Sequence, residues 1–300
     1  MNWSSSDVAV SVVVVVYDMA RELPRTLHTL SREYQRGDVN YEVIVVDNGS
    51  PVPVDPAVLD IVPAGRLIRI DPAPPSPAHA CNVGIEAASG DIVGVLIDGA
   101  RMVSPGLISS ALDAVATGNR VIATTLAFHL GDEPQMAAAA KGYNQSVEDE
   151  LLSTVDWAND GDLLFSISTF GGSSARGWYG PMGECNALFM AADLWSEIDG
   201  FDEIFDRPGG GLVNHDLYRR ACAAPNTDLV MMLGEGSFHQ FHGGAATGGT
   251  AVRDELWSEY EALRGAKFEP PERLARYVGE VAPSAQHHLA RSVDWRDRHV

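Results

Sequence analysis

The sequence predicts an α/β fold with a mostly parallel central sheet, and the order of its segments is the main reason. Short apolar runs alternate with helix-like segments through the first hundred residues. Strands that alternate with helices need crossover connections, and such connections give parallel strands. The run at 8–16 is rich in valine, which is typical of a strand that is buried on both faces of a sheet.

The expected elements follow one another in a definite order. In the first half, strands are expected at 8–17, 41–46, 66–70 and 91–97, and helices at 21–34 and 78–88. In the second half, helices are expected at 137–153, 193–198 and 217–224, a strand at 229–233 and another helix from 252. Glycine and serine predominate at 168–177, which predicts a mobile loop. The last thirty or so residues follow a proline pair and are expected to form a helical arm, a dimer contact or a loose tail.

Composition excludes several classes of function. The net charge of −20 argues against nucleic acid or an anionic membrane as a partner, because both need a basic surface. No apolar run reaches the roughly 20 residues that span a bilayer, and no basic segment precedes the run at 8–16, so we expect neither a membrane span nor a signal peptide. Three scattered cysteines, Cys81, Cys185 and Cys222, predict reduced thiols and a cytoplasmic protein.

Acidic residues follow three successive predicted strands, at Asp18, Asp47 and Asp98. Parallel sheets bind ligands at the carboxyl edge, where these strands end. Asp47 could accept hydrogen bonds from a nucleobase or ribose, or it could hold only an Asx turn. Asp98 could hold a divalent cation that bridges two phosphates, or it could cap the following helix.

Five short motifs, the last of them in two parts, follow one another along the chain. They are the valine-rich first strand, V-V-D-N-G-S at 45–50, A-x-N-x-G-I-x-x-A-x-G-D at 80–91, the strand that ends at Asp98, and the pair E-C-N-A-L-F-M and I-D-G-F-D-E at 184–190 and 198–203. Over roughly residues 8 to 220, this order resembles the family-two glycosyltransferases of the GT-A fold. The resemblance implies a Rossmann-like nucleotide-binding domain with a mostly parallel sheet and a nucleotide-sugar donor.

The resemblance also assigns donor-binding residues. It implies that Tyr17 and Asp47 contact the nucleoside, that Asn82 lies near the donor, and that Asp98 is the first aspartate of the family's D-x-D metal motif. Glu184 is expected at the floor of the glycine-rich loop, where it could bind a sugar hydroxyl. The chain departs from the motif at its third position, where Ala100 stands. One expected carboxylate is therefore missing, and another group must complete the metal site.

Two histidines, His239 and His242, are candidates for that role. Both lie in a glycine-framed stretch, and several GT-A enzymes supply a metal-binding histidine from this part of the chain. The expected cofactor is a divalent metal, Mn²⁺ or Mg²⁺, and imidazole suits Mn²⁺ better. In an extended chain the two rings would point to opposite faces, so we expect one metal ligand, with His242 favoured and His239 contacting phosphate or acceptor. A purely structural role is the alternative.

A base for the acceptor hydroxyl is expected at the helix near residue 217. In the family an acidic pair stands at the start of this helix, and here Asn214 and His215 precede Asp216. Asp216 is the first candidate, since a helix N-terminus would keep it ionised, and His215 is the second. Asp216 could instead only cap the helix. The weakened acidic pair leaves inverting or retaining chemistry open, although the family at large inverts.

The sequence therefore predicts a metal-dependent hexosyltransferase that moves a sugar from a UDP- or GDP-sugar to a soluble acceptor, either a sugar or a small metabolite. The transferase domain is expected at 1–250, with a donor half to about 130 and an acceptor half to 250, and a helical C-terminal extension at 251–300. A homodimer is compatible with that extension. The alternatives are a pseudoenzyme that binds nucleotide sugars and a sugar-nucleotide pyrophosphorylase, which is disfavoured because no glycine-rich phosphate loop follows the first strand.

Overall fold

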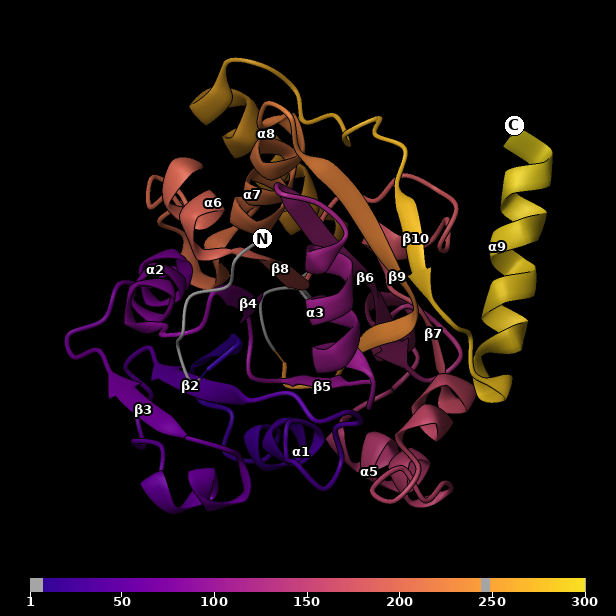
Figure 1. Ribbon diagram of the computed structural model, residues 1–300, viewed down its shortest axis with the longest axis horizontal. Helices are drawn as coiled ribbons and strands as arrows, with labels where there is room; N and C mark the ends of the chain where they lie inside the picture. Colours follow the sequence, from indigo (N-terminus) through magenta and orange to yellow (C-terminus); the bar gives the residue numbers. More distant parts are fainter. Residues whose placement is uncertain (1–7, 244–248, 300) are drawn as a thin grey trace.

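The computed structural model describes residues 8–243 and 249–299, and residues 249–253 only as backbone. This part of the chain forms a mixed α/β fold around one ten-stranded sheet, with the strand order β10-β9-β6-β8-β4-β1-β2-β3, β5 beside β9 and β7 beside β6 (Figure 1). No helix in the described ranges is long and apolar enough to cross a membrane.

The strands of the sheet are mostly parallel. They are β1 (Val10–Val16), β2 (Tyr41–Asp47), β3 (Arg66–Arg69), β4 (Ile92–Leu96), β5 (Arg101–Val103), β6 (Val121–Leu130), β7 (Ser168–Phe170), β8 (Ala187–Ala191), β9 (Asp228–His239) and β10 (Arg276–Gly279). β1, β2, β3 and β4 run parallel, while β8 lies antiparallel between β4 and β6. β9 is parallel to β6, and therefore to β4, so its carboxyl end lies at the same edge of the sheet as theirs.

Both faces of the sheet are covered, as the valine-rich first strand predicts. All seven residues of β1 are buried. Val13 and Val15 pack in one apolar cluster with α2 (Ala78–Ala87), α6 (Ala192–Glu197) and α7 (Val213–Ala223). Val12 and Val14 pack in the other cluster with α1 (Leu23–Thr29) and α3 (Leu107–Ala116). The strand alternates between two cores, which explains why it has so few polar residues.

The single helix expected at 137–153 is two helices. α4 (Gln135–Ala139) and α5 (Gln145–Ser153) are separated by a turn in which Gly142 has a φ of +97°. Asn144 then caps α5, since its side chain accepts hydrogen bonds from the backbone N–H groups of Ser146 and Val147. A left-handed glycine and a side-chain cap end one helix and begin the next.

The strand expected at 229–233 is much longer. β9 continues through Gly234, which has a φ of +77°, to His239, and the pairing with β6 shifts register there at a β-bulge. The glycines that suggest a turn in the sequence accommodate this bulge. The strands at 121–130 and 187–191 and the helix at 107–116 were not assigned from the sequence. The loop expected from 168 begins as the short strand β7.

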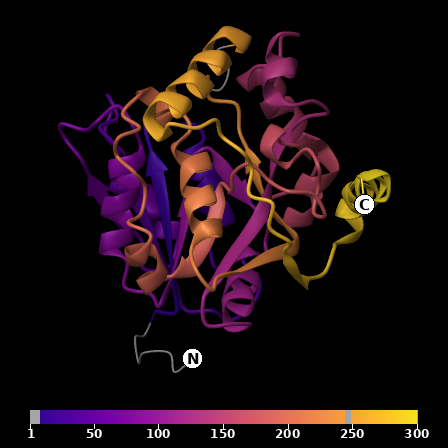
Figure 2. The same cartoon turned by 90° about the horizontal axis from the view of Figure 1, so that it is seen from above.

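The C-terminal segment is not only helical. α8 (Gly249–Arg264) packs on α7, β10 pairs in parallel with β9, and α9 (Gln286–His299) follows. Figures 1 and 2 show α9 at the side of the molecule, apart from the other helices. Short 3₁₀ turns complete the described part at Pro56–Ile61, Gly161–Ile167, Gly172–Ser174, Pro208–Gly210 and Pro283–Ala285.

Candidate active site

The carboxyl edge of the sheet gathers several predicted site residues. Tyr17 follows β1, Asp47 ends β2, and Asp98 lies two residues after the end of β4. β9 brings His239 to this same edge, although 141 residues separate His239 from Asp98 in sequence. Tyr17 is 55% exposed there, so its ring is available to a ligand.

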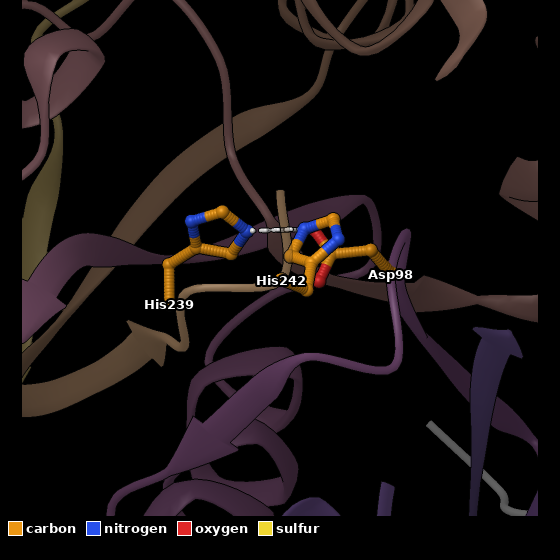
Figure 3. A group of neighbouring side chains, drawn as sticks. All are labelled: Asp98, His239 and His242. Atoms are coloured by element: carbon orange, nitrogen blue, oxygen red, sulfur yellow. Dashed lines mark hydrogen bonds and ion pairs between the residues drawn. The ribbon is translucent and has the colours of Figure 1, made fainter. Parts of the chain in front are cut away.

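Asp98, His239 and His242 form a cluster whose potential metal-ligating atoms all lie within 4.8 Å of one another. The Nε2 atoms of the two histidines are 3.1 Å apart, and Asp98 Oδ2 is 3.8 Å from His239 Nε2. Figure 3 shows the two rings facing each other with the carboxylate beside them. The structure therefore brings together all three predicted metal ligands.

The segment that follows β9 explains why the imidazole rings of His239 and His242 lie close together. Gln240 is buried, its backbone N–H donates to Ala100 O, and its side-chain amide donates to Glu22 O and Thr26 Oγ1 at α1. The backbone N–H of Phe241 donates to the carboxylate of Glu148 on α5. The chain is thus not extended between the histidines, and the expected divergence of their rings does not occur.

The charges of the cluster suit metal binding. Burial alone would raise the pKa of Asp98, but nearby positive charge, chiefly the guanidinium of Arg101, outweighs burial and lowers this pKa to about 2. Burial and the charge of Arg101 hold the pKa of His239 well below its usual range. Asp98 is therefore ionised and His239 neutral at neutral pH, which are the forms that bind metal.

The spacing of the two histidines fits a metal as well. Two ligand atoms bound side by side to one ion, at about 2.1 Å each, lie about 3 Å apart. The Nε2 atoms of His239 and His242 have this separation. One carboxylate oxygen and two imidazole nitrogens form a donor set that suits a transition metal such as Mn²⁺ or Zn²⁺ better than Mg²⁺.

A second group of side chains lies around Glu184, which precedes β8, and His215, which lies in the first turn of α7. His215 Nδ1 is 3.4 Å from Glu184 Oε2, and Asn214 Nδ2 donates to the same oxygen over 2.9 Å. Burial raises the pKa of Glu184, but His215 and Asn214 lower it below its usual range. The imidazole lines a pocket of about 410 Å³ together with Trp257 and Phe268.

Residues 11–156 match the sequence profile described as Glycosyl transferase family 2. This region of the chain belongs to glycosyl transferase family 2. This match covers the strands that carry Tyr17, Asp47 and Asp98, and it confirms the resemblance that the motifs indicate. No curated protein matches the chain.

Solved structures of GT-A glycosyltransferases share the fold of the chain. Staphylococcus aureus TarS is 14% identical with a TM-score of 0.52, and the match covers 97% of this chain and 43% of TarS. TarS 1–349 in complex with UDP is 14% identical (TM-score 0.50, 97% and 71% covered). The same fragment in complex with UDP-GlcNAc is 13% identical (TM-score 0.50, 97% and 72% covered). At such identities the likeness shows the fold, and the chain spans less than half of the longer TarS chain.

Asp216 differs from the other predicted site residues. It is fully buried, and its oxygens accept hydrogen bonds of 2.7 Å from Arg220 of α7 and Arg264 of α8. α7 begins at Val213, so Asp216 lies inside the first turn and does not cap the helix. A carboxylate enclosed by two guanidinium groups would have to break these pairs before it could take a proton from a substrate. The geometry favours His215 over Asp216 as a base.

Two predicted donor residues are engaged in structural contacts. Asp47 is buried and holds its turn by accepting from the backbone N–H groups of Ser50 and Val54, and it pairs with Arg69 over 2.5 Å. Asn82 lies on α2 and bonds both the N–H and the carbonyl of Phe201. Asn82 lines a different pocket, of about 540 Å³, which includes none of the other predicted site residues. The structure therefore does not bring Asn82 to the cluster.

Two further residues lie at the site, and sequence reasoning missed the first of them, His129. His129 on β6 has its ring 5.8 Å from that of His239, and its Nδ1 accepts from the backbone N–H of Gln135. Arg101 on β5 donates from Nε to Asp98 Oδ2 over 2.9 Å. The position of Arg101 three residues after Asp98 was a usable signal, whereas only the register between β6 and β9 places His129.

Proposed function

We propose that this chain transfers a sugar from a nucleoside-diphosphate sugar to an acceptor hydroxyl, with a divalent metal held by Asp98, His239 and His242. The observation that carries the proposal is the convergence of these three side chains at the carboxyl edge of the sheet, beside the exposed Tyr17. Ligands of open α/β sheets bind at this edge. Family membership supplies the reaction class.

UDP-sugars are the first donors to test. TarS 1–349, which shares the fold, has been solved with UDP and with UDP-GlcNAc. In the proposed complex the ring of Tyr17 stacks on the base, because an exposed aromatic face suits a planar ligand. Asp47 would then act indirectly, by holding the 47–50 turn that lies beside the end of β1, where Asp18 N–H donates to Ser50 Oγ. GDP-sugars are the second class of donor in this proposal.

The metal would neutralise charge that develops on the diphosphate when it leaves. Asp98 contributes an anionic oxygen and the histidines contribute neutral nitrogens, a set that supports Mn²⁺ ahead of Mg²⁺. Ala100, at the third position of the metal motif, is buried in the apolar cluster that contains Val16 and Met19. A carboxylate at position 100 would face this core, so His239 and His242 replace it in the proposed site.

His215 is the proposed base. Glu184 lies 3.4 Å from its Nδ1 and would orient the ring and stabilise the imidazolium that forms when His215 takes the acceptor's proton. Gly183 is close to the imidazole edge and leaves space that a larger side chain would fill. A positioned base supports direct displacement and therefore inversion at the anomeric carbon.

The pocket beside His215 is the proposed acceptor site. Trp257 and Phe268 present aromatic rings, with centroids 5.6 Å and 5.2 Å from that of His215, and such rings stack on sugar faces. This lining supports a sugar or another small hydroxyl-bearing acceptor. Three buried free thiols accord with the proposed cytoplasmic location, where cysteines stay reduced.

The test is release of nucleoside diphosphate. Purified protein is incubated with UDP-GlcNAc, UDP-glucose or GDP-mannose, with Mn²⁺ or EDTA, and with a panel of mono- and oligosaccharide acceptors. We expect metal-dependent, acceptor-stimulated release from one donor and its loss in Asp98→Ala. Tight nucleotide binding without release for any donor and acceptor would contradict the proposal and favour a pseudoenzyme.

A further inference from the structure

Arg101 is a buried cation at the centre of the candidate active site. It is the first residue of β5, where it pairs in register with His239 of β9, and it is only 8% exposed. Met102 and Val103, which complete the strand, are fully buried, so the backbone that carries Arg101 is held firmly. A guanidinium in such a place needs partners, because burying a charge without hydrogen bonds is costly.

The structure satisfies only part of this need. Nε of Arg101 donates to Asp98 Oδ2, while Nη1 is buried and has no hydrogen-bond partner among the described residues. Arg220, by comparison, is paired more fully. Its Nε, Nη1 and Nη2 donate to Asp216 and to the carbonyls of Ile198 and Gly200. Arg101 keeps donor capacity that Arg220 does not have.

The field of Arg101 reaches both halves of the site. Its charge contributes to the lowered pKa of Asp98 and of His239 on the metal side, after burial in each case. It also contributes to the lowered pKa of Glu184 on the acceptor side, after burial and His215. The guanidinium is therefore close enough to act electrostatically on both groups. In a sugar transfer, the diphosphate separates from the sugar between the metal and the acceptor.

We propose that Arg101 is a catalytic residue that binds the sugar-bearing phosphate of the donor and stabilises it as the leaving group. In the transfer, the bond between the anomeric carbon and the phosphate oxygen breaks, and its electron pair stays on that oxygen. The acceptor oxygen bonds to the same carbon, and its proton passes to His215. The free donors of Arg101 bond the phosphate as its negative charge grows. This inference rests on the proposed function.

Phosphate binding by Arg101 would offset the repulsion between this acidic protein and a diphosphate. The protein has a net charge of −20, and the site itself contains the carboxylates of Asp98 and Glu184, so it would repel a diphosphate. With Ala100 in the metal motif, fewer anionic ligands would hold the metal. A fixed guanidinium offsets repulsion whether or not metal is bound. Its effect is therefore measurable in the absence of metal.

The experiment compares UDP with UMP by calorimetry in EDTA. Wild type is expected to prefer UDP, because only UDP carries the second phosphate. Arg101→Gln, whose amide can still donate to Asp98, is expected to reduce the ratio of UDP to UMP affinity by about tenfold or more and to leave UMP affinity nearly unchanged. Arg101→Lys retains the positive charge but lacks the planar set of donors of a guanidinium. Its ratio of UDP to UMP affinity is expected to lie between those of wild type and Arg101→Gln. Arg298→Ala, on the exposed face of α9, is the control.

Several results would overturn the assignment. An unchanged preference in a folded Arg101→Gln protein, or a parallel loss of UDP and UMP affinity, shows that Arg101 only supports Asp98. If Arg101→Gln shows no cooperative thermal unfolding, the test is made with Arg101→Lys instead. A preference for UDP over UMP in Arg101→Lys that equals that of wild type would then contradict the assignment. Failure of wild type to bind either nucleotide, with Mn²⁺ as well as with EDTA, overturns the proposed function and this inference with it.

Discussion

The Nε2 atoms of His239 and His242 face each other across 3.1 Å, although both side chains come from the same short stretch of chain. In the hydrogen bond between them one Nε2 donates and the other accepts, and both nitrogens could bind one cation if each ring carried its proton on Nδ1. The buried Gln240 between them fixes this geometry. The pair is therefore held in position before any ligand arrives.

Removing either ring should weaken metal binding. We expect His242→Ala and His239→Ala each to lower Mn²⁺ affinity by about tenfold or more, measured by calorimetry or by the loss of the free Mn²⁺ electron paramagnetic resonance signal. His79→Ala is the matched control, because His79 also lies against a carboxylate, that of Glu203, but on α2. Equal Mn²⁺ affinity in all three variants and in wild type would show that the pair is not a metal site.

Asp216 should prove structural. Removing one partner of a buried ion pair leaves the other unpaired, so Asp216→Asn is expected to lower the free energy of unfolding by about 3 kcal/mol or more, measured by urea denaturation at pH 7. Asn keeps the shape but not the charge. A fully stable Asp216→Asn protein without transferase activity would instead restore Asp216 as the base.

The stability difference between wild type and Asp216→Asn should depend on pH in a predictable way. Burial raises the pKa of Asp216, but hydrogen bonds from Arg264 and Arg220 outweigh it, and the folded-state pKa is lowered. An acid with a lowered folded-state pKa stabilises the fold above its unfolded pKa of about 3.9 and loses that contribution as the pH falls further. The stability difference between wild type and Asp216→Asn should be constant from pH 7 to 5 and should shrink below about pH 4. A difference that stays the same at pH 3.5 would argue against this ion pair.

His215 should affect turnover and spare nucleotide binding. We expect His215→Ala to reduce nucleoside diphosphate release by about 100-fold or more, with UDP affinity within twofold of wild type. Glu184→Gln can still accept from Asn214, but it lacks the charge that supports an imidazolium, so a smaller loss is expected. His299→Ala, at the exposed end of α9, is the control. Equal turnover in His215→Ala and His299→Ala would eliminate His215 as the base.

The loop beside the acceptor pocket should depend on α9. Gly177 has a φ of +68°, and a Cβ there would lie 2.1 Å from Ser292 Oγ, which accepts from the Trp178 N–H. Gly177→Ala is therefore expected to lower the free energy of unfolding by about 1–3 kcal/mol and to speed hydrogen exchange across α9. Gly172→Ala is the matched control, since a Cβ at Gly172 meets open space. Equal exchange of α9 in both variants would show that the loop and the helix are not coupled.

Local patterns predicted most elements of the first hundred residues well. The strands at 10–16, 41–47 and 92–96 and the helix at 78–87 are close to their expected bounds, because apolar runs and helical spacing are signals within a short window. The strand at 228–239 extends past its expected end, because a β-bulge at Gly234 cannot be told from a turn without the partner strand.

The site residues show the same contrast between local sequence signals, which could be predicted, and tertiary contacts, which could not. Asp98 and the two histidines were predicted from strand ends and a family motif, and the structure brings them together. The surroundings of Asp216 could not be predicted, because Arg264 lies 48 residues away in sequence and contacts it only through the packing of α8 on α7. Asn82 matches the family motif, but its contacts with Phe201 depend on tertiary structure.

The central claim is that Asp98, His239 and His242 hold a metal that bridges a nucleoside diphosphate. Calorimetric titration of UDP into wild type, Asp98→Ala and His242→Ala, each with Mn²⁺ and with EDTA, tests this claim most directly. The account predicts that Mn²⁺ strengthens UDP binding to wild type by about tenfold or more and that both variants lose this gain while remaining folded. Binding of UDP that is equally tight with Mn²⁺ and with EDTA, or a gain that survives in both variants, would contradict it.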